Sequence, residues 1–384
     1  MSADASAQTR LPLGLKLYHG LGSVAYGVKD NGFSTFLLLF YNQVLGMDAK
    51  LVSLALMLAL VLDAFVDPVI GYLSDQTHTR WGRRLPWLYI APIPLAFAWF
   101  ALWTPEAGAT PSFWHLVGVA VIVRSLVSCC EVPSVALLPE LTRDYDERTT
   151  LMRYRYLFGW AGGLLMLFLA YDLFLAKSLL AVEGYYQYGL FGGLLMAATV
   201  LISAAGQHRW AARWPDRKPS ALSPVTAFRE IREALTHPAF LILLAAGAIA
   251  YTSQGVTFSI SNYLYLFIWK FSPVAFKIYP WVLFASVVGT FLLIGPAQRR
   301  FGKRTTAIAG GMIGMIFWVT PFVLRHLHLW PVEGSTASTA GLFVFFFLAN
   351  LFSVSVMISG GSMIADIVEA SEVETGRRSE GTFF

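Results

Sequence analysis

Two carboxylates inside an apolar stretch offer the clearest chemistry in this sequence. Asp63 and Asp67 stand four residues apart in LVSLALMLALVLDAFVDPVIGYL, and in a helix that spacing places both on one face. A carboxylate within a membrane costs on the order of a few kcal/mol, so it usually marks a polar cavity or an ion path. Two such groups repel unless a cation or a shared proton lies between them. The pair predicts a site for Na⁺ or H⁺; alternatively, the two acids pair with buried bases or cap backbone groups freed by Pro68.

Three further polar residues interrupt other apolar stretches. Glu131 follows Ser128 by three residues in SLVSCCEVPSVALLPEL, on the same helical face, which predicts a contact with a substrate or ion. The alternative is that Glu131 hydrogen-bonds a backbone break at Pro133. Lys29 and Asp30 lie mid-stretch in AYGVKDNGFSTF, where they either contact a solute or pair with each other or with other helices.

Charges at the ends of apolar stretches suggest a mechanical role. In GYLSDQTHTRWGRR an acid ends one stretch and three arginines follow, so the charges can clasp neighbouring helix ends in one access state and separate in another. The second half of the chain holds a similar set. The first set is Asp75, Arg80, Arg83 and Arg84, and the second includes Asp366 and Arg377. The alternative is that these charges set the membrane topology and have no gating role.

The elements that must position these residues are membrane helices. Of the 384 residues, 56% are hydrophobic and only 13% are charged, far from the composition of a soluble domain. Apolar stretches of roughly 20 residues recur, and each is long enough to cross a bilayer as a helix. We therefore predict an all-α polytopic membrane protein with ten complete spans. These are residues 15–45, 51–75, 85–104, 112–139, 151–176, 185–206, 238–269, 274–296, 305–325 and 339–367.

The basic residues determine the predicted orientation. The formal net charge is +5, but the lysines and arginines form short clusters in alternate connections between spans, which excludes a nucleic-acid surface. Because cytoplasmic loops accumulate such residues, we expect a multi-pass protein of the cytoplasmic (inner) membrane with its amino terminus in the cytoplasm.

Enzyme chemistry has little support in the sequence. The two cysteines, Cys129 and Cys130, are adjacent in an apolar run and are interpreted as core residues. We find no metal-binding His/Cys/carboxylate cluster, no nucleophile elbow and no phosphate-binding glycine loop. We expect no cofactor and no metal beyond a coupling cation, and partners limited to a small-molecule substrate and membrane lipid, with a monomeric protein.

A repeated loop divides the chain. Residues 80–84 read RWGRR and residues 300–304 read RFGKR, each after an even-numbered span, as expected of two parallel repeats. We predict an N-terminal six-helix bundle over 1–206, a cytoplasmic linker with a short amphipathic helix over 207–237, and a C-terminal bundle over 238–384. Because the second bundle then holds four helices and the start of a fifth, we expect a fragment of a twelve-helix protein, or else a shortened one.

The same residues resemble a known family. Residues 63–71 (DAFVDPVIG) and 79–87 (TRWGRRLPW) are similar to motifs of the glycoside–pentoside–hexuronide cation symporters, the melibiose-permease branch of the major facilitator superfamily. Weaker support comes from residues 132–133, 146–148 and 365–368, and the resemblance covers nearly the whole chain. It implies a twelve-helix fold that works by alternating access.

The resemblance also implies roles for individual residues. Asp63, Asp67 and Ser128 correspond to ligands of the coupling Na⁺ or H⁺, and Glu131 corresponds to a sugar-contacting acid. Arg155 lies one residue from the register of a sugar-contacting arginine. The chain departs from the family where Gly27 takes the place of a first-helix aspartate and Val135 that of a stacking aromatic residue.

The resulting hypothesis is a cation-coupled symporter of a sugar or glycoside. The substrate contacts would come from Glu131, Asp30, Lys29 and Arg155. Related lysolipid transporters share the D-x-x-x-D-P motif, so the alternative is a cation-coupled transporter of a lysolipid or another amphipathic solute.

Overall fold

A computed structural model describes residues 11–105, 110–142, 144–212 and 238–375. These ranges consist of helices and loops, with an isolated bridge between Thr79 and Gly82. The chain divides into two compact units, Met1–Pro219 and Ser220–Phe384. The predicted linker lies outside the described residues from position 213 onward, and its first residues continue the preceding helix.

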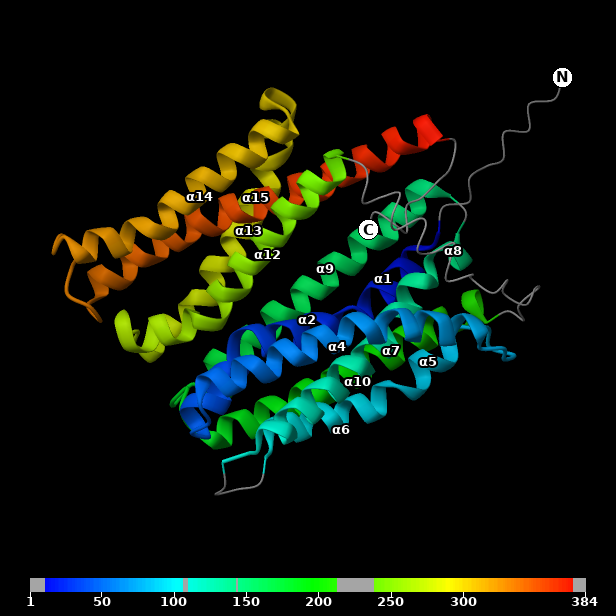
Figure 1. The fold of residues 1–384 in the computed structure, drawn as a ribbon, viewed down its shortest axis with the longest axis horizontal. Coiled ribbons are helices and arrows are strands. Elements are labelled where there is room, and N and C mark those ends of the chain that lie inside the picture. The colour runs from blue at the N-terminus through cyan, green and yellow to red at the C-terminus, as the bar shows by residue number, and fades with distance from the viewer. Residues whose placement is uncertain (1–10, 106–109, 143, 213–237, 376–384) are drawn as a thin grey trace. The chain divides into compact units, whose positions relative to one another are not determined.

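The helices of the first unit, shown in blue to green in Figure 1, run in chain order. They are α1 (Leu13–Leu21), α2 (Val24–Asn31), the π-helical η1 (Gly32–Phe36), α3 (Leu37–Leu39), the π-helical η2 (Phe40–Val44), α4 (Ala49–Gln76), α5 (Leu85–Ile90), α6 (Pro92–Trp103), α7 (Phe113–Ala136), α8 (Leu138–Leu141), α9 (Tyr145–Leu169), the π-helical η3 (Ala170–Phe174) and α10 (Val182–Ala211).

The second unit contributes a smaller set of described helices. They are α12 (Pro238–Tyr263), the π-helical η4 (Leu264–Ile268), α13 (Pro273–Phe301), α14 (Lys303–His326) and α15 (Thr336–Thr375).

Within the described residues, seven helices are long and apolar enough to cross a membrane. The predicted span 15–45 is a series of short α- and π-helical pieces, and the span 85–104 divides at Ala91, just before Pro92. The span 238–269 consists of α12 followed by η4. An all-helical membrane protein is therefore confirmed, whereas the count of ten complete spans is not confirmed and stays a prediction.

Pairs of neighbouring helices build the first unit. α4 packs against α7, α2 against α9 and α6 against α10, while α1 contacts both α9 and α10 (Figure 1). Aromatic side chains fill the space between α6 and α10, where the rings of Trp103 and Tyr185 stack with centroids 5.8 Å apart. Large apolar side chains face outward, such as Phe65 of α4, which is 69% exposed. Such an outer surface suits a lipid solvent.

The two corners identified as repeats share their backbone geometry. Gly82 and Gly302 have φ values of 91° and 79°, in the left-handed region where glycine has no steric cost. The first and seventh predicted spans also both end in π-helical turns, η2 and η4. These local similarities support the interpretation of two repeats.

Helix α15 holds the second unit together through contacts with α13 and α14. The hydroxyl of Thr290 in α13 donates to the carbonyl of Leu351 in α15 at 2.9 Å. The side-chain amide of Asn350 donates to Ser286 Oγ at 2.6 Å. Polar pairs of this kind fix helix register in a membrane, where dispersion alone is unspecific.

Candidate functional site

An ion pair joins α4 to α7 at the first of the two predicted carboxylates. Arg124 Nε and Nη2 donate to Asp63 Oδ2 at 3.0 and 2.6 Å, and the two side chains are only 12% and 14% exposed. Ser128 Oγ donates to Asp63 Oδ1 at 3.3 Å. Both carboxylate oxygens of Asp63 therefore already accept hydrogen bonds within the protein.

Asp67 lies one helical turn further along α4 in a different environment. Its Oδ1 atom is buried and has no hydrogen-bond partner among the described residues. A Cβ added at Gly71, another turn along, would lie 3.7 Å from a methyl group of Val132 in α7. Because Asp63 and Gly71 both meet α7, Asp67 lies on the same packed face. The two acids are thus neighbours, but within the described part of the chain only Asp63 has a basic partner.

A second ion pair follows about two turns further along α7. Arg155 of α9 forms an ion pair with Glu131, and its Nη1 donates to Ser134 Oγ at 2.6 Å. The arginine side chain is 3% exposed, whereas that of Glu131 is 30% exposed. The structure therefore brings Glu131 and Arg155 together and leaves part of the Glu131 carboxylate accessible to a solute.

The adjacent residues Lys29 and Asp30 of α2 lie in different surroundings. Lys29 is buried with its Nζ 4.4 Å from the ring centroid of Tyr26, whereas Asp30 is exposed. Lys29 also lies within electrostatic range of Asp63 and Glu131. Of the two, only Lys29 has its side chain in the interior of the first unit.

Close backbone packing explains the departure at Gly27. A Cβ added there would lie 1.8 Å from the carbonyl oxygen of Gly159 in α9, much closer than any non-bonded contact allows. The backbones of α2 and α9 fill the space that an aspartate at this position would need. Position 27 therefore has no room for a side chain that could contact a substrate.

The sequence analysis did not identify Arg124, although this residue forms an ion pair with the predicted Asp63. The available signal was the spacing used for the aspartates, because Arg124 precedes Ser128 by four residues within an apolar stretch. Ser134, the second partner of Arg155, was also missed. A lone serine in a membrane helix gives no comparable signal, because it can bond to its own backbone.

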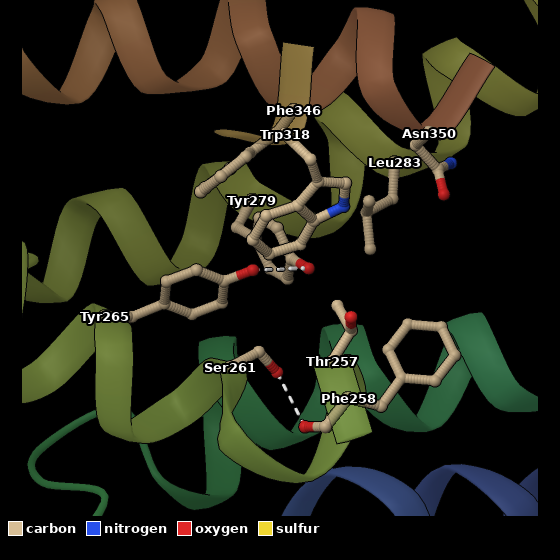
Figure 2. Close-up of a pocket in the computed structure, with 9 residues that line it drawn as sticks. All are labelled: Thr257, Phe258, Ser261, Tyr265, Tyr279, Leu283, Trp318, Phe346 and Asn350. Atoms are coloured by element: carbon tan, nitrogen blue, oxygen red, sulfur yellow. Dashed lines mark hydrogen bonds between the residues drawn. The ribbon is translucent and has the colours of Figure 1, made fainter. Parts of the chain in front are cut away.

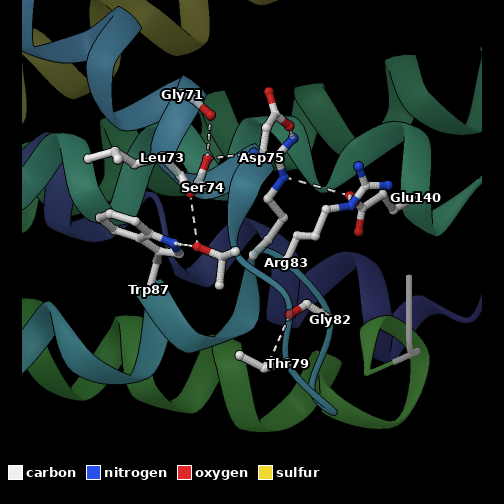
Figure 3. A network of polar contacts seen from close by, with 11 residues as sticks. Gly71, Leu73, Ser74, Asp75, Thr79, Gly82, Arg83, Trp87 and Glu140 are labelled. Carbon is white, nitrogen blue, oxygen red and sulfur yellow. Dashed lines mark hydrogen bonds and ion pairs between the residues drawn. The ribbon is translucent and has the colours of Figure 1, made fainter. Parts of the chain in front are cut away.

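The loop after α4 forms a compact charge cluster (Figure 3). Arg84 pairs with Asp75, donates to Ser74 Oγ at 2.5 Å, and has its Nε 3.6 Å from Glu140 Oε1. Arg83 also approaches Glu140, at 3.8 Å. The cluster thereby connects α4, the following loop and α8. Glu140 was not predicted.

Of the remaining predicted gating residues, the structure describes the side chain of Arg80 alone, and it does not join this cluster. Arg80 is exposed, with its guanidinium 5.5 Å from the ring centroid of Trp81. The side chain of Asp366 and the whole of Arg377 lie outside the described part of the structure, so the second gating set stays a prediction.

The second unit contains a pocket lined by aromatic rings and short polar side chains (Figure 2). The hydroxyl of Tyr265 donates to that of Tyr279 at 3.0 Å, and Ser261 Oγ donates to the carbonyl of Phe258 at 2.7 Å. All of the described helices of the unit, α12, η4, α13, α14 and α15, contribute to its lining, which comprises Thr257, Phe258, Ser261, Tyr265, Tyr279, Leu283, Trp318, Phe346 and Asn350. Rings beside hydroxyl and amide groups suit a polyhydroxylated or amphipathic solute.

A family model described as MFS/sugar transport protein matches residues 18–384. The chain belongs to this family. MFS/sugar transport proteins include the melibiose-permease-like cation symporters, so the predicted resemblance is confirmed. Membership also confirms that the protein is a transporter and not an enzyme.

Individual relatives agree with this assignment. The chain is 28% identical to an uncharacterized symporter of Synechocystis sp., with 100% of this chain and 83% of the relative covered. It is 24% identical to the isoprimeverose transporter of Lactiplantibacillus pentosus, over 99% of this chain and 77% of that protein. A shorter similarity, 28% identity over 39% of this chain and 28% of the relative, is to the sodium-dependent lysophosphatidylcholine symporter 1 of Gallus gallus.

Solved structures support the fold. The partially occluded inward-open xylose transporter XylE from E. coli is similar with a TM-score of 0.62 and 15% identity, covering 97% of this chain and 90% of that one. The major facilitator fold predicted from the sequence is therefore confirmed at the level of its overall class.

Proposed function

We propose that this protein is a symporter that couples the movement of Na⁺ or H⁺ to the uptake of a sugar or glycoside across the cytoplasmic membrane. In this proposal the amino terminus lies in the cytoplasm and the protein acts as a monomer by alternating access. The cation site is centred on Asp67, with Asp63 and Ser128 beside it. Lys29, Glu131 and Arg155 contact the substrate, and the exposed Asp30 is the weakest candidate.

One observation supports this proposal most directly. A polar layer lies in the apolar interior of the first unit, from the Asp63–Arg124 pair to the Glu131–Arg155 pair about two turns further along the same helix, α7. Buried charges are expensive in a membrane, so such a layer is retained where it serves an ion or solute. Both pairs include a residue of α7, so a movement of this helix at one pair also displaces the other pair. Such a connection between two sites is the physical requirement for coupling.

The two ends of the layer suit different ligands. Asp67 offers a buried carboxylate oxygen without a partner in the described residues, as a coupling cation requires. Glu131 is partly exposed and held by Arg155, so it can accept hydrogen bonds from sugar hydroxyls.

A second candidate function is transport of a lysolipid or another amphipathic solute. The sodium-dependent lysophosphatidylcholine symporter similarity covers part of the chain. Lys29 is buried and forms no ion pair with a carboxylate of the described residues, so it could receive a phosphate group.

Uptake by the purified protein in proteoliposomes tests the proposal. Radiolabelled glycosides, including isoprimeverose, and lysophosphatidylcholine are offered with an inward Na⁺ gradient, an inward H⁺ gradient, or neither. We expect at least one glycoside to accumulate at least about tenfold faster with one of the gradients. Absence of gradient-driven glycoside uptake would refute the proposal, and lysophosphatidylcholine uptake in its place would establish the second candidate.

A further inference from the structure

The guanidinium of Arg124 lies where a cation bound to Asp63 would lie. Two of its nitrogen atoms donate to the same carboxylate oxygen, Oδ2, at 3.0 and 2.6 Å. Phe33 of η1 covers the guanidinium from another side, with its ring centroid 5.6 Å from Arg124 Cζ. Since aromatic faces attract guanidinium groups, the arginine is held at Asp63 by contacts from two helices.

The remaining oxygen of Asp63 is also engaged. Ser128 donates to Oδ1, so the hydroxyl hydrogen points toward Asp63 and one of its lone pairs is directed elsewhere. Na⁺ is a hard cation that binds through several oxygen atoms at once. A Na⁺ ion between the two aspartates would have to displace Arg124 from Asp63 or rely on Asp67 with few further ligands.

The charges near the two aspartates also indicate that Arg124 takes the place of a cation at Asp63. Among the described residues, Asp63 pairs with Arg124 of α7, and Lys29 of α2 lies within electrostatic range of Arg124, Asp30, Asp63 and Glu131. The other segments packed on α4 are α3, which has no ionisable side chain, and η2, whose Tyr41 donates to the carbonyl of Leu102. Arg124 thus already supplies one of the two positive charges that the aspartate pair needs.

We propose that Arg124 is a tethered cation that occupies Asp63 in place of Na⁺, and that it determines the ion specificity of this transporter. Asp67 is then the single carboxylate left for the coupling ion. This inference rests on the ion site of the proposed function but not on its substrate. It predicts that removing Arg124 creates a Na⁺ site where the wild-type protein has none of comparable strength.

Thermal unfolding of the purified chain in detergent, without substrate, tests this inference. A ligand that binds the folded state raises the midpoint in a concentration-dependent way. NaCl replaces choline chloride at constant ionic strength and pH, so that screening stays equal. We expect no saturable Na⁺-specific shift for the wild type below about 100 mM. For Arg124→Gln we expect a saturable shift with an apparent Na⁺ affinity at least about tenfold higher.

Two variants serve as controls. Arg124→Lys keeps the charge and should remain insensitive to Na⁺. Asp63→Asn in the Arg124→Gln background removes the freed carboxylate and should abolish the gained shift. A saturable Na⁺-specific shift in the wild type that equals that of Arg124→Gln would overturn the inference, as would a gain that survives Asp63→Asn.

An unpaired Asp63 is destabilising, so Arg124→Gln can fail to fold. In that case the wild-type protein and its Asp63→Asn variant test the inference. Na⁺-specific stabilisation of the wild type that Asp63→Asn removes would refute the tethered cation, and its absence would support it. The outcome is also separate from that of the proposed function. A chain that shows this Na⁺ pattern but transports no glycoside keeps the inference and loses the substrate assignment.

Discussion

At the scale of single residues, identical side chains acquire different chemistry from their neighbours. Asp63 has Arg124 and Ser128 within hydrogen-bond distance, whereas the buried oxygen of Asp67 has no partner among the described residues. The adjacent residues Lys29 and Asp30 differ in exposure, because Lys29 is buried and Asp30 is exposed. Arg155 holds Glu131 in place, yet the carboxylate remains partly accessible.

We predict that Glu131→Gln weakens substrate transport, while the new amide oxygen can still accept a hydrogen bond from the buried Arg155. A hydrogen bond to a charged group contributes about 1.5–3 kcal/mol, so the apparent substrate affinity should fall by roughly 10–100-fold. Uptake measured over a range of glycoside concentrations provides the value. Glu333→Gln is the matched control, because that acid pairs with Arg325 at 2.9 Å in a connection of the second unit, and its affinity should stay unchanged.

At the scale of elements, glycines determine how closely helices approach. The contact between α2 and α9 brings Gly27 against the backbone of Gly159, and small residues allow such close crossings in membranes. This packing places Lys29 of α2 and Arg155 of α9 within one polar layer. A larger residue at position 27 would force the two helices apart and displace both cations.

Gly27→Ala should therefore destabilise the folded protein strongly. The added Cβ would meet a backbone oxygen, which cannot move as a side chain can, so we expect a fall of at least about 2 kcal/mol in unfolding free energy. Thermal unfolding in detergent measures the loss. Gly14→Ala in α1 is the control, since a Cβ there has nothing within 4 Å; an equal effect of both variants would contradict the packing argument.

The charge cluster after α4 supports a second prediction at this scale. Arg84 is buried and contacts Ser74, Asp75 and Glu140, whereas Arg80 is exposed. Arg84→Gln removes the base that pairs with Asp75 and leaves Glu140 with Arg83 alone, so it should lower the unfolding midpoint by several degrees. Arg80→Gln should change it by less than about one degree, because exposed charges contribute little. Similar shifts for both would show that the cluster is not structural.

At the scale of the whole molecule, the protein is a membrane transporter with two compact units. The chain matches the MFS/sugar transport family over residues 18–384. We assign the binding of the ion and the substrate to the polar layer of the first unit. Coupling then means that ion binding in the first unit alters the conformational equilibrium of the whole chain.

We expect Asp67→Asn to separate accumulation from exchange. Without the carboxylate the ion cannot bias the conformational equilibrium, so uptake against a gradient should fall by at least about tenfold. Exchange of external for internal glycoside requires no net ion movement and should persist. Counterflow in proteoliposomes distinguishes these processes, and a variant that still accumulates substrate like the wild type would exclude Asp67 as the coupling residue.

The sequence alone determined the class of the molecule. Its apolar stretches, alternating basic loops and aspartate motif indicated a helical cation-coupled transporter, because membrane insertion and charge burial impose patterns that are local in the chain. The tertiary structure decided which charges meet. Arg124 lies about sixty positions from Asp63, Arg155 more than twenty from Glu131, and Gly27 far from Gly159. These contacts depend on how helices pack, and no local pattern specifies them. The sequence thus predicted the aspartate pair. Only the tertiary structure showed that Arg124 binds one of the two aspartates, Asp63.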